Sequence, residues 1–88
     1  MPELSRFYNI IIKMQYLDVK QHHKPHIHAF SGQYSASIGL DGELLAGALP
    51  VKELRMVQAW IAIHETELYI AWGKAVKGER IERIDPLR

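Results

Sequence analysis

The stretch of sequence that decides the fold is Gln33-Tyr34-Ser35-Ala36-Ser37-Ile38-Gly39-Leu40-Asp41-Gly42-Glu43-Leu44-Leu45. Every second residue from Tyr34 to Leu40 is apolar, which is the period of a half-buried β-strand. Asp41-Gly42 favours a two-residue hairpin turn, because a type I′ turn needs positive φ at both central residues. With that turn Ile38 pairs with Leu45. The sequence therefore predicts two antiparallel strands over residues 33–40 and 43–49.

Two further strands are predicted before this hairpin. Residues 7–16 contain three consecutive isoleucines, and their β-branched side chains favour an extended backbone. A period of two places one set of their side chains on a common face, namely Tyr8, Ile10, Ile12, Met14 and Tyr16. After a polar loop, a short strand over residues 26–30 leads into Ser31-Gly32, which is a typical turn pair.

One long amphipathic helix is predicted after the hairpin, over about residues 51–76. Pro50 suits its first turn, and Gly78 lies where a helix is expected to stop. At about 100° per residue, two adjoining apolar stripes cover an arc of roughly 200°, which is wider than packing on one sheet requires. The second stripe consists of Met56, Trp60, Ile63 and Ile70.

These elements predict an α+β fold in a single domain over residues 1–88. We expect a mainly antiparallel sheet of three or four strands with one long helix packed on one face. In the charged C-terminal tail, the apolar residues Ile81 and Ile84 fit either a short edge strand or a docked extension.

Composition excludes several functional classes. The chain has no cysteine, so a disulfide scaffold, a thiolate zinc site and a thiol nucleophile are excluded. A net charge of +1 provides no global cationic field, and nucleic-acid binding would need a local patch. The isoleucine run is too short to span a bilayer, and the N-terminal residues lack the order of a signal peptide. We therefore expect a cytoplasmic protein with no membrane partner.

The wide apolar arc of the helix has two interpretations. In the first, the tail or a loop folds back over Trp60 and Ile63. In the second, Met56, Trp60, Ile63 and Ile70 form a docking surface for a second small protein or for a homodimer. Exposed aromatic and aliphatic side chains clustered on a helix are typical anchors of such interfaces. We prefer the second interpretation.

Histidines are the other unusual feature, because four of the five lie between residues 22 and 28. His26 and His28 are two residues apart, so on a strand their side chains point the same way. With a turn at Ser31-Gly32 they face away from the core, beside two serine hydroxyls. His22, in the preceding loop, can bend over the same patch.

Three roles fit this histidine patch. His22, His26 and His28 are candidate ligands for a divalent metal such as zinc. The same groups are also suited to bind phosphate or RNA, where a pair of imidazoles can act as general acid and base. In the third role the histidines form hydrogen bonds within the sheet and loop. His64, on the core stripe of the helix, is expected to be a buried structural histidine.

Several of these segments together resemble a known family. They are Ser5-Arg6-Phe7, Ile10-Ile11-Ile12-Lys13-Met14, His22 with Pro25-His26-Ile27-His28-Ala29, Asp41-Gly42-Glu43, Leu49-Pro50, and a helix containing Trp60, His64, Glu67-Leu68 and Trp72. This pattern is similar to the small bacterial domain of unknown function 4160 over nearly the whole chain. The family typically has Asp-His-x-Pro-Pro-His-Phe-His, from which Gln21, Lys24 and Ile27 depart here.

The resemblance implies an α+β fold and a partner protein, but no established activity. Members are often encoded next to a second small domain and have been suggested to be components of toxin–antitoxin-like pairs. We therefore expect a small bacterial protein-interaction module, one component of such a two-protein system, with the helix stripe as its docking surface. The alternative is a histidine-centred metal-binding, RNA-binding or RNA-cleaving protein. Whether the chain is an enzyme stays open.

Overall fold

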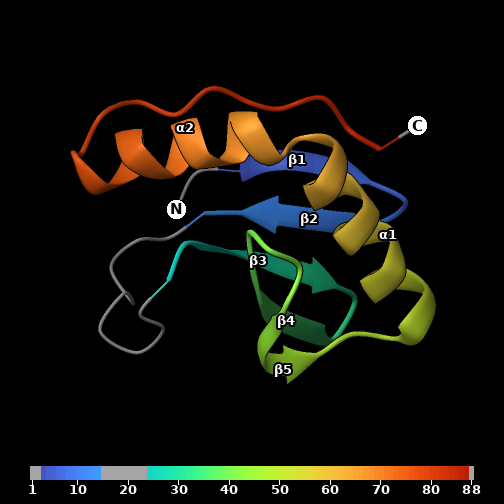
Figure 1. The fold of residues 1–88 in the computed structure, drawn as a ribbon. Helices are drawn as coiled ribbons and strands as arrows, with labels where there is room; N and C mark the ends of the chain where they lie inside the picture. The colour runs from blue at the N-terminus through green and yellow to red at the C-terminus, as the bar shows by residue number, and fades with distance from the viewer. Residues whose placement is uncertain (1–2, 15–23, 88) are drawn as a thin grey trace.

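The computed structural model describes residues 3–14 and 24–87 (Figure 1). Its elements are β1 (Glu3–Phe7), β2 (Ile10–Lys13), β3 (His26–Ser31), β4 (Tyr34–Gly39), β5 (Leu44–Ala48), α1 (Val51–Ile63) and α2 (Glu65–Val76). The strands form one antiparallel sheet in the order β1-β2-β3-β4-β5. The predicted α+β class is confirmed, with five strands and two helices where three or four strands and one helix were expected.

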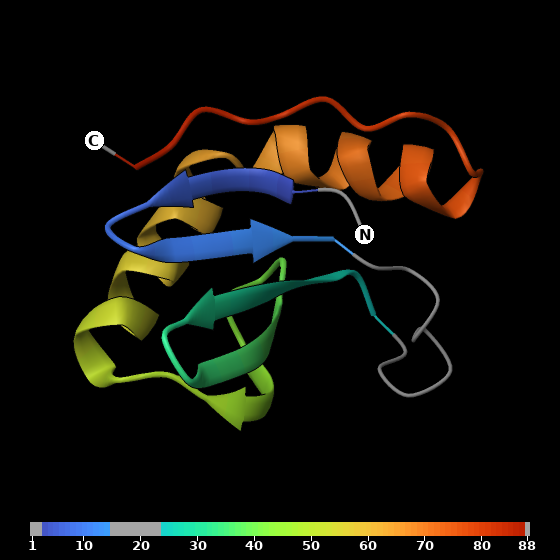
Figure 2. The ribbon, with the colours of Figure 1, turned by 180° about the vertical axis from the view of Figure 1, so that it is seen from behind.

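Both helices lie on the same face of the sheet. They are in front of β1 and β2 in Figure 1, and these strands are in front when the molecule is seen from behind in Figure 2. The core between the layers is aliphatic and aromatic, and its most deeply buried members include Ile10, Ile12, Ile27, Ile38, Val57, Trp60 and Leu68. In the described residues neither helix is long and apolar enough to cross a membrane.

The first strand of the sheet was not predicted, because a tight turn interrupts residues 7–16. Tyr8 and Asn9 have φ values of 48° and 64°, and positive φ at both central residues is the condition for a type I′ hairpin turn. β1 therefore folds back on β2, with Phe7 opposite Ile10. The Tyr8 side chain is exposed rather than on the core face. Ile10, Ile12 and Met14, predicted to share one face, are all buried, and Tyr16 lies outside the described residues.

The hairpin between β3 and β4 turns one residue later than predicted. The turn is Gly32-Gln33, so His28 lies opposite Ser37 instead of Ser35. A change of two residues in the partner leaves the side chains of Ile27, His28 and Ala29 on their expected sides of the sheet, because the side-chain period of a strand is two. The sequence therefore predicted the faces of these three residues correctly and the register incorrectly.

The hairpin between β4 and β5 is irregular. Ile38 pairs with Leu44 rather than with Leu45, because the register shifts between Ser37 and Ile38. In the predicted Asp41-Gly42 turn only Gly42 has positive φ, at 93°, so the turn is not the expected type I′ turn.

The predicted single helix is broken at His64, which has φ −109° and ψ 26° between α1 and α2. A straight helix over residues 51–76 would be about 39 Å long, whereas the longest extent of the molecule is 33 Å. The bend lets both halves stay on the sheet (Figure 1). No glycine or proline marks it, because residues 51–72 contain neither.

The C-terminal segment over residues 79–87 runs back along α2 without regular secondary structure (Figure 1). The Ile84 N–H donates to the Leu4 carbonyl at 2.8 Å, and Trp60 Nε1 donates to the Asp85 carbonyl at 2.8 Å. The tail is therefore a docked extension, one of the two forms expected. It covers Trp60, which is fully buried, and this corrects the expectation that Trp60 is part of an exposed stripe.

Candidate functional site

The outer side of α2 is the first surface that carries residues singled out by the sequence. Of the predicted stripe, Ile63 and Ile70 are exposed as expected, Met56 is partly buried against the core, and Trp60 is buried. Four of the eight large apolar side chains that are exposed in the described residues fall between residues 63 and 76. They are Ile63 (66% exposed), Tyr69 (46%), Ile70 (56%) and Val76 (53%).

Gly73 lies at the centre of this surface. On a helix, residues three or four positions apart are neighbours, and Gly73 is in that relation to Tyr69, Ile70 and Val76. A Cβ atom added at Gly73 would meet no atom of the residues that the structure describes within 4 Å, apart from the helix around it. We call Tyr69, Ile70, Gly73 and Val76 the α2 surface. It is an apolar area with a gap at its centre.

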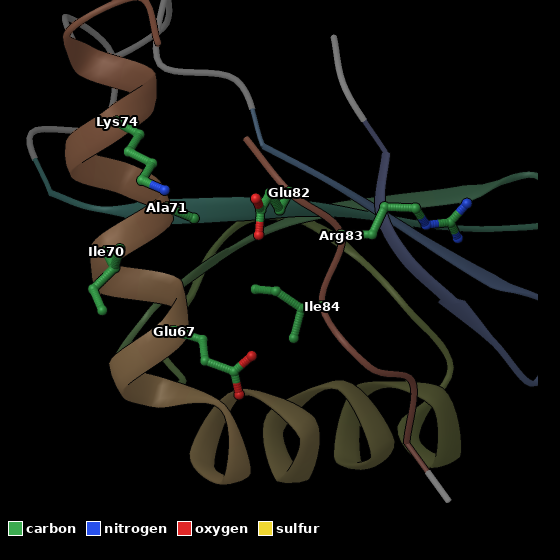
Figure 3. Close-up of a pocket in the computed structure, with 7 residues that line it drawn as sticks. All are labelled: Glu67, Ile70, Ala71, Lys74, Glu82, Arg83 and Ile84. Atoms are coloured by element: carbon green, nitrogen blue, oxygen red, sulfur yellow. The ribbon is translucent and has the colours of Figure 1, made fainter. Parts of the chain in front are cut away.

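A hollow of about 160 Å³ borders the α2 surface at Ile70. Figure 3 shows Glu67 and Lys74 projecting from α2 toward the tail, and Glu82 and Ile84 projecting from the tail toward α2. The Arg83 side chain points away from the hollow (Figure 3) and binds Glu3, with Nη2 2.8 Å from Oε2. The hollow therefore combines apolar walls with charged groups of both signs.

The sheet face opposite the helices is the second surface, and we call it the open sheet face. The strand register places side chains there in two rows: Lys13, His28, Ser37 and Ala46 in one, and Ile11, Phe30, Ser35 and Ala48 in the other. The alternate residues Ile12, Ala29 and Ala36 are buried in the core. The expected outward placement of His28 is thus confirmed, and its Nδ1 lies 3.4 Å from Ser37 Oγ.

His26 departs from the expectation, because it is fully buried rather than facing water. Its ring centroid lies 5.3 Å from that of Trp72 on α2 and 5.3 Å from that of His28. Its Nδ1 lies 2.9 Å from the Lys24 carbonyl oxygen, and because a carbonyl can only accept, Nδ1 donates this hydrogen bond. Trp72, a residue of the second helix, therefore covers this imidazole.

The expected zinc site is not tested as a whole, because His22 lies outside the described residues. Over residues 3–14 and 24–87, no group of three histidine, cysteine or acidic side chains is placed to hold a metal ion. His64, which was expected to be buried, also departs from the prediction. It is partly buried at the break between the helices, and its Nδ1 lies 2.7 Å from Glu67 Oε1.

We expect His26→Ala to lower the free energy of unfolding by about 2–3 kcal/mol, because it leaves a cavity beside Trp72 and removes a buried hydrogen bond. His28→Ala, at a half-exposed position, should cost less than about 1 kcal/mol. Urea unfolding followed by circular dichroism measures both values. Equal losses for the two variants would contradict the different placement of the two rings.

Lys24 holds the start of β3 against the loop between β4 and β5, a link that sequence reasoning missed. Its ammonium group binds the carboxylates of Glu43 and Asp41, the latter at 2.8 Å. These two hydrogen bonds raise the pKa of Lys24. The hydrogen bond that Asp41 accepts from Lys24 lowers the pKa of Asp41. A Cβ atom on Gly39 would lie 2.8 Å from Lys24 Cε. The partners are 17 and 19 residues apart, which no local pattern reveals.

The lowered pKa of Asp41 predicts a pH-dependent contribution to stability. Because the pKa is lower in the folded state than in the unfolded state, the ionised carboxylate stabilises the fold at neutral pH. This contribution is lost as pH falls through the folded-state pKa. The difference in urea midpoint between the wild type and Asp41→Asn should therefore shrink between about pH 6 and about pH 2. A difference that stays constant over this range would contradict the ion pair.

Comparison with known proteins gives one match. The profile of the family described as "Domain of unknown function (DUF4160)" matches residues 9–73, well over half of the chain. The chain belongs to the DUF4160 family. No curated protein and no solved structure matches it. The DUF4160 match contains β2 to β5, α1, and Tyr69, Ile70 and Gly73 of the α2 surface. β1 and the tail that covers Trp60 lie outside it.

Proposed function

We propose that this DUF4160 domain is a protein-interaction module, one component of a two-protein system of the toxin–antitoxin-like kind. Its partner, a second small protein, binds the α2 surface. The observation that carries the proposal is that half of the exposed large apolar side chains of the described residues fall in residues 63–76. Soluble monomers rarely leave apolar side chains together on one surface, and such areas are typical of interaction sites.

Gly73 supports the same proposal independently. Glycine inside a helix costs about 1 kcal/mol relative to alanine. No described residue requires it at this position, because a Cβ atom there would meet open space. A glycine at the centre of an apolar helix surface allows another chain to approach the helix backbone closely. Gly73 thus lowers the stability of the isolated domain, and close contact with a bound partner would explain why a glycine is present there.

The hollow beside Ile70 indicates how the partner is anchored. Its apolar walls include Ala71 and Ile84, and its rim carries Glu67, Lys74 and Glu82. Stable interfaces usually have an apolar centre inside a polar rim, and an anchor side chain in a pocket supplies much of the affinity. The partner is therefore expected to insert an aliphatic or aromatic side chain between α2 and the tail.

The burial of His26 weakens the RNA-cleaving form of the alternative function. Acid–base cleavage of RNA by a pair of imidazoles needs both rings at the bound phosphodiester, and His26 is enclosed beside Trp72. Of the two histidines on β3, His28 is the one at the open sheet face, and His22 lies outside the described residues.

Co-expression with the product of the adjacent gene tests the proposed function. We expect the two proteins to purify together and to elute as a complex with the summed mass. Ile70→Lys should weaken the complex at least about 10-fold, as loss of a central anchor does. Val51→Lys is the matched control, because Val51 is also exposed but lies at the start of α1. Separate elution of the two proteins would overturn the proposal, and a homodimer dissociated by Ile70→Lys would contradict the choice of partner.

A further inference from the structure

The open sheet face contains a second hollow, of about 180 Å³, that the proposed function does not use. Its lining is made of His28, Phe30, Ser35, Ala36, Ser37, Ala46 and Gly47. All but the histidine and the phenylalanine are small residues. At Gly47, φ is 75°, and a Cβ atom would lie 2.3 Å from the Ser35 carbonyl oxygen. Glycine there lets β5 lie close against β4.

An aromatic ring, a cation and an imidazole meet at one side of this hollow. Lys13 lies directly opposite His28 in the register between β2 and β3. The Lys13 ammonium nitrogen is 5.6 Å from the centroid of the Phe30 ring. Ser35 and Ser37 follow on β4, opposite Phe30 and His28. Stacking surface, positive charge and hydroxyl groups are therefore adjacent on neighbouring strands.

The charges of this face favour an anion. Arg6, opposite Ile11, extends the second row onto β1 and is exposed. Glu3, opposite Lys13, is bound by Arg6 and Arg83, with both Nη2–Oε distances at 2.8 Å. Two guanidinium groups thus outweigh the negative charge of the Glu3 carboxylate, and Lys13 adds a further positive charge. The local balance is positive although the net charge of the chain is only +1.

We propose that the open sheet face binds a nucleotide, with its base stacked on Phe30 and its phosphate bound by Lys13 and His28. Stacking of bases on aromatic side chains beside cationic groups is the general mode by which sheets bind single-stranded nucleic acid. The small residues of β4 and β5 leave room for the flat base, and the serine hydroxyls can donate to its polar edge. A free nucleotide and a nucleotide within single-stranded RNA present the same chemistry to this face.

Fluorescence anisotropy of a labelled single-stranded RNA octamer tests the proposal, with unlabelled nucleoside monophosphates as competitors. Phe30→Leu keeps an apolar side chain and removes the ring, and we expect it to weaken binding about 10-fold. Lys13→Ala should weaken binding and reduce the slope of log affinity against log salt by about 1. Tyr34→Ala is the matched control, because it removes an exposed aromatic side chain elsewhere on β4.

Two outcomes support the site and distinguish its ligand. Binding of the octamer with weak competition by mononucleotides indicates single-stranded RNA, and equally strong binding of mononucleotides indicates a free nucleotide. Failure of both probes to bind at about 100 μM, the weak end of non-specific affinity, would overturn the proposal. Binding unaffected by Phe30→Leu and Lys13→Ala would also overturn it. None of these outcomes depends on the partner at the α2 surface.

Discussion

Replacing Trp60 with alanine is expected to lower the free energy of unfolding by about 3–5 kcal/mol, as for other buried tryptophans. The indole is fully buried, and its ring centroid lies 5.6 Å from that of Phe7 and 5.5 Å from that of His64. Its Nε1–H also donates to the Asp85 carbonyl. Small domains have a total stability of about 5–15 kcal/mol, so the variant should be close to unfolding at room temperature.

Urea unfolding followed by circular dichroism measures this effect, and Trp60→Phe is the graded control. Phenylalanine fills most of the space and loses only the hydrogen bond, so we expect a loss of about 1–2 kcal/mol for that variant. A loss below about 1 kcal/mol for Trp60→Ala would contradict its burial and restore it as a residue of the docking surface.

The second large effect concerns the docked tail. Ile84 is buried against the core, and its N–H donates to Leu4. Ile84→Asp should release the tail and cost about 3 kcal/mol, since it removes an aliphatic side chain from the core and places a charge there. Trypsin should then cut rapidly after Arg80 and Arg83.

Glu82→Ala is the matched control for the tail, because Glu82 is exposed two residues earlier. It should change the unfolding free energy by no more than about 0.5 kcal/mol and leave the rate of trypsin cleavage unchanged. Slow cleavage of Ile84→Asp would show that the tail is held by contacts other than the one to the core. That result would contradict the account of how Trp60 is covered.

Local patterns predicted the faces of the strands well. The alternation around Ile10, Ile12 and Ile38 correctly assigned the core side, because a period of two does not depend on where the chain turns. The turns themselves were predicted poorly. Tyr8-Asn9 forms a type I′ turn without glycine, and the register shift between Ser37 and Ile38 was not predicted.

Long-range packing explains the remaining errors. The helical period correctly identified an arc wider than one sheet covers, but it could not distinguish the side covered by the tail from the side that stays exposed. Trp60, which was predicted at the interface, therefore lies in the core, whereas Ile63 and Ile70 are exposed as predicted. In the same way, alternation predicted that His26 faces water beside His28, whereas its ring lies against Trp72, 46 positions later in the chain, and is buried.

The two proposed surfaces are compatible with each other. The α2 surface belongs to a helix, and both helices lie on one side of the sheet (Figures 1 and 2). The nucleotide hollow is lined mainly by side chains that the strand register places on the opposite face. A protein partner and a nucleotide can therefore be bound at the same time. The variants of one surface serve as controls for the other.

The dissociation constant of the complex between Gly73→Ala and the product of the adjacent gene tests partner binding at the α2 surface most directly. Alanine should stabilise the isolated domain by up to about 1 kcal/mol, because it removes the cost of glycine within the helix. The added methyl group should nevertheless weaken the complex about 10-fold, because it blocks close approach at the centre of the interface. An unchanged dissociation constant for Gly73→Ala, together with an unchanged one for Ile70→Lys, would contradict the account.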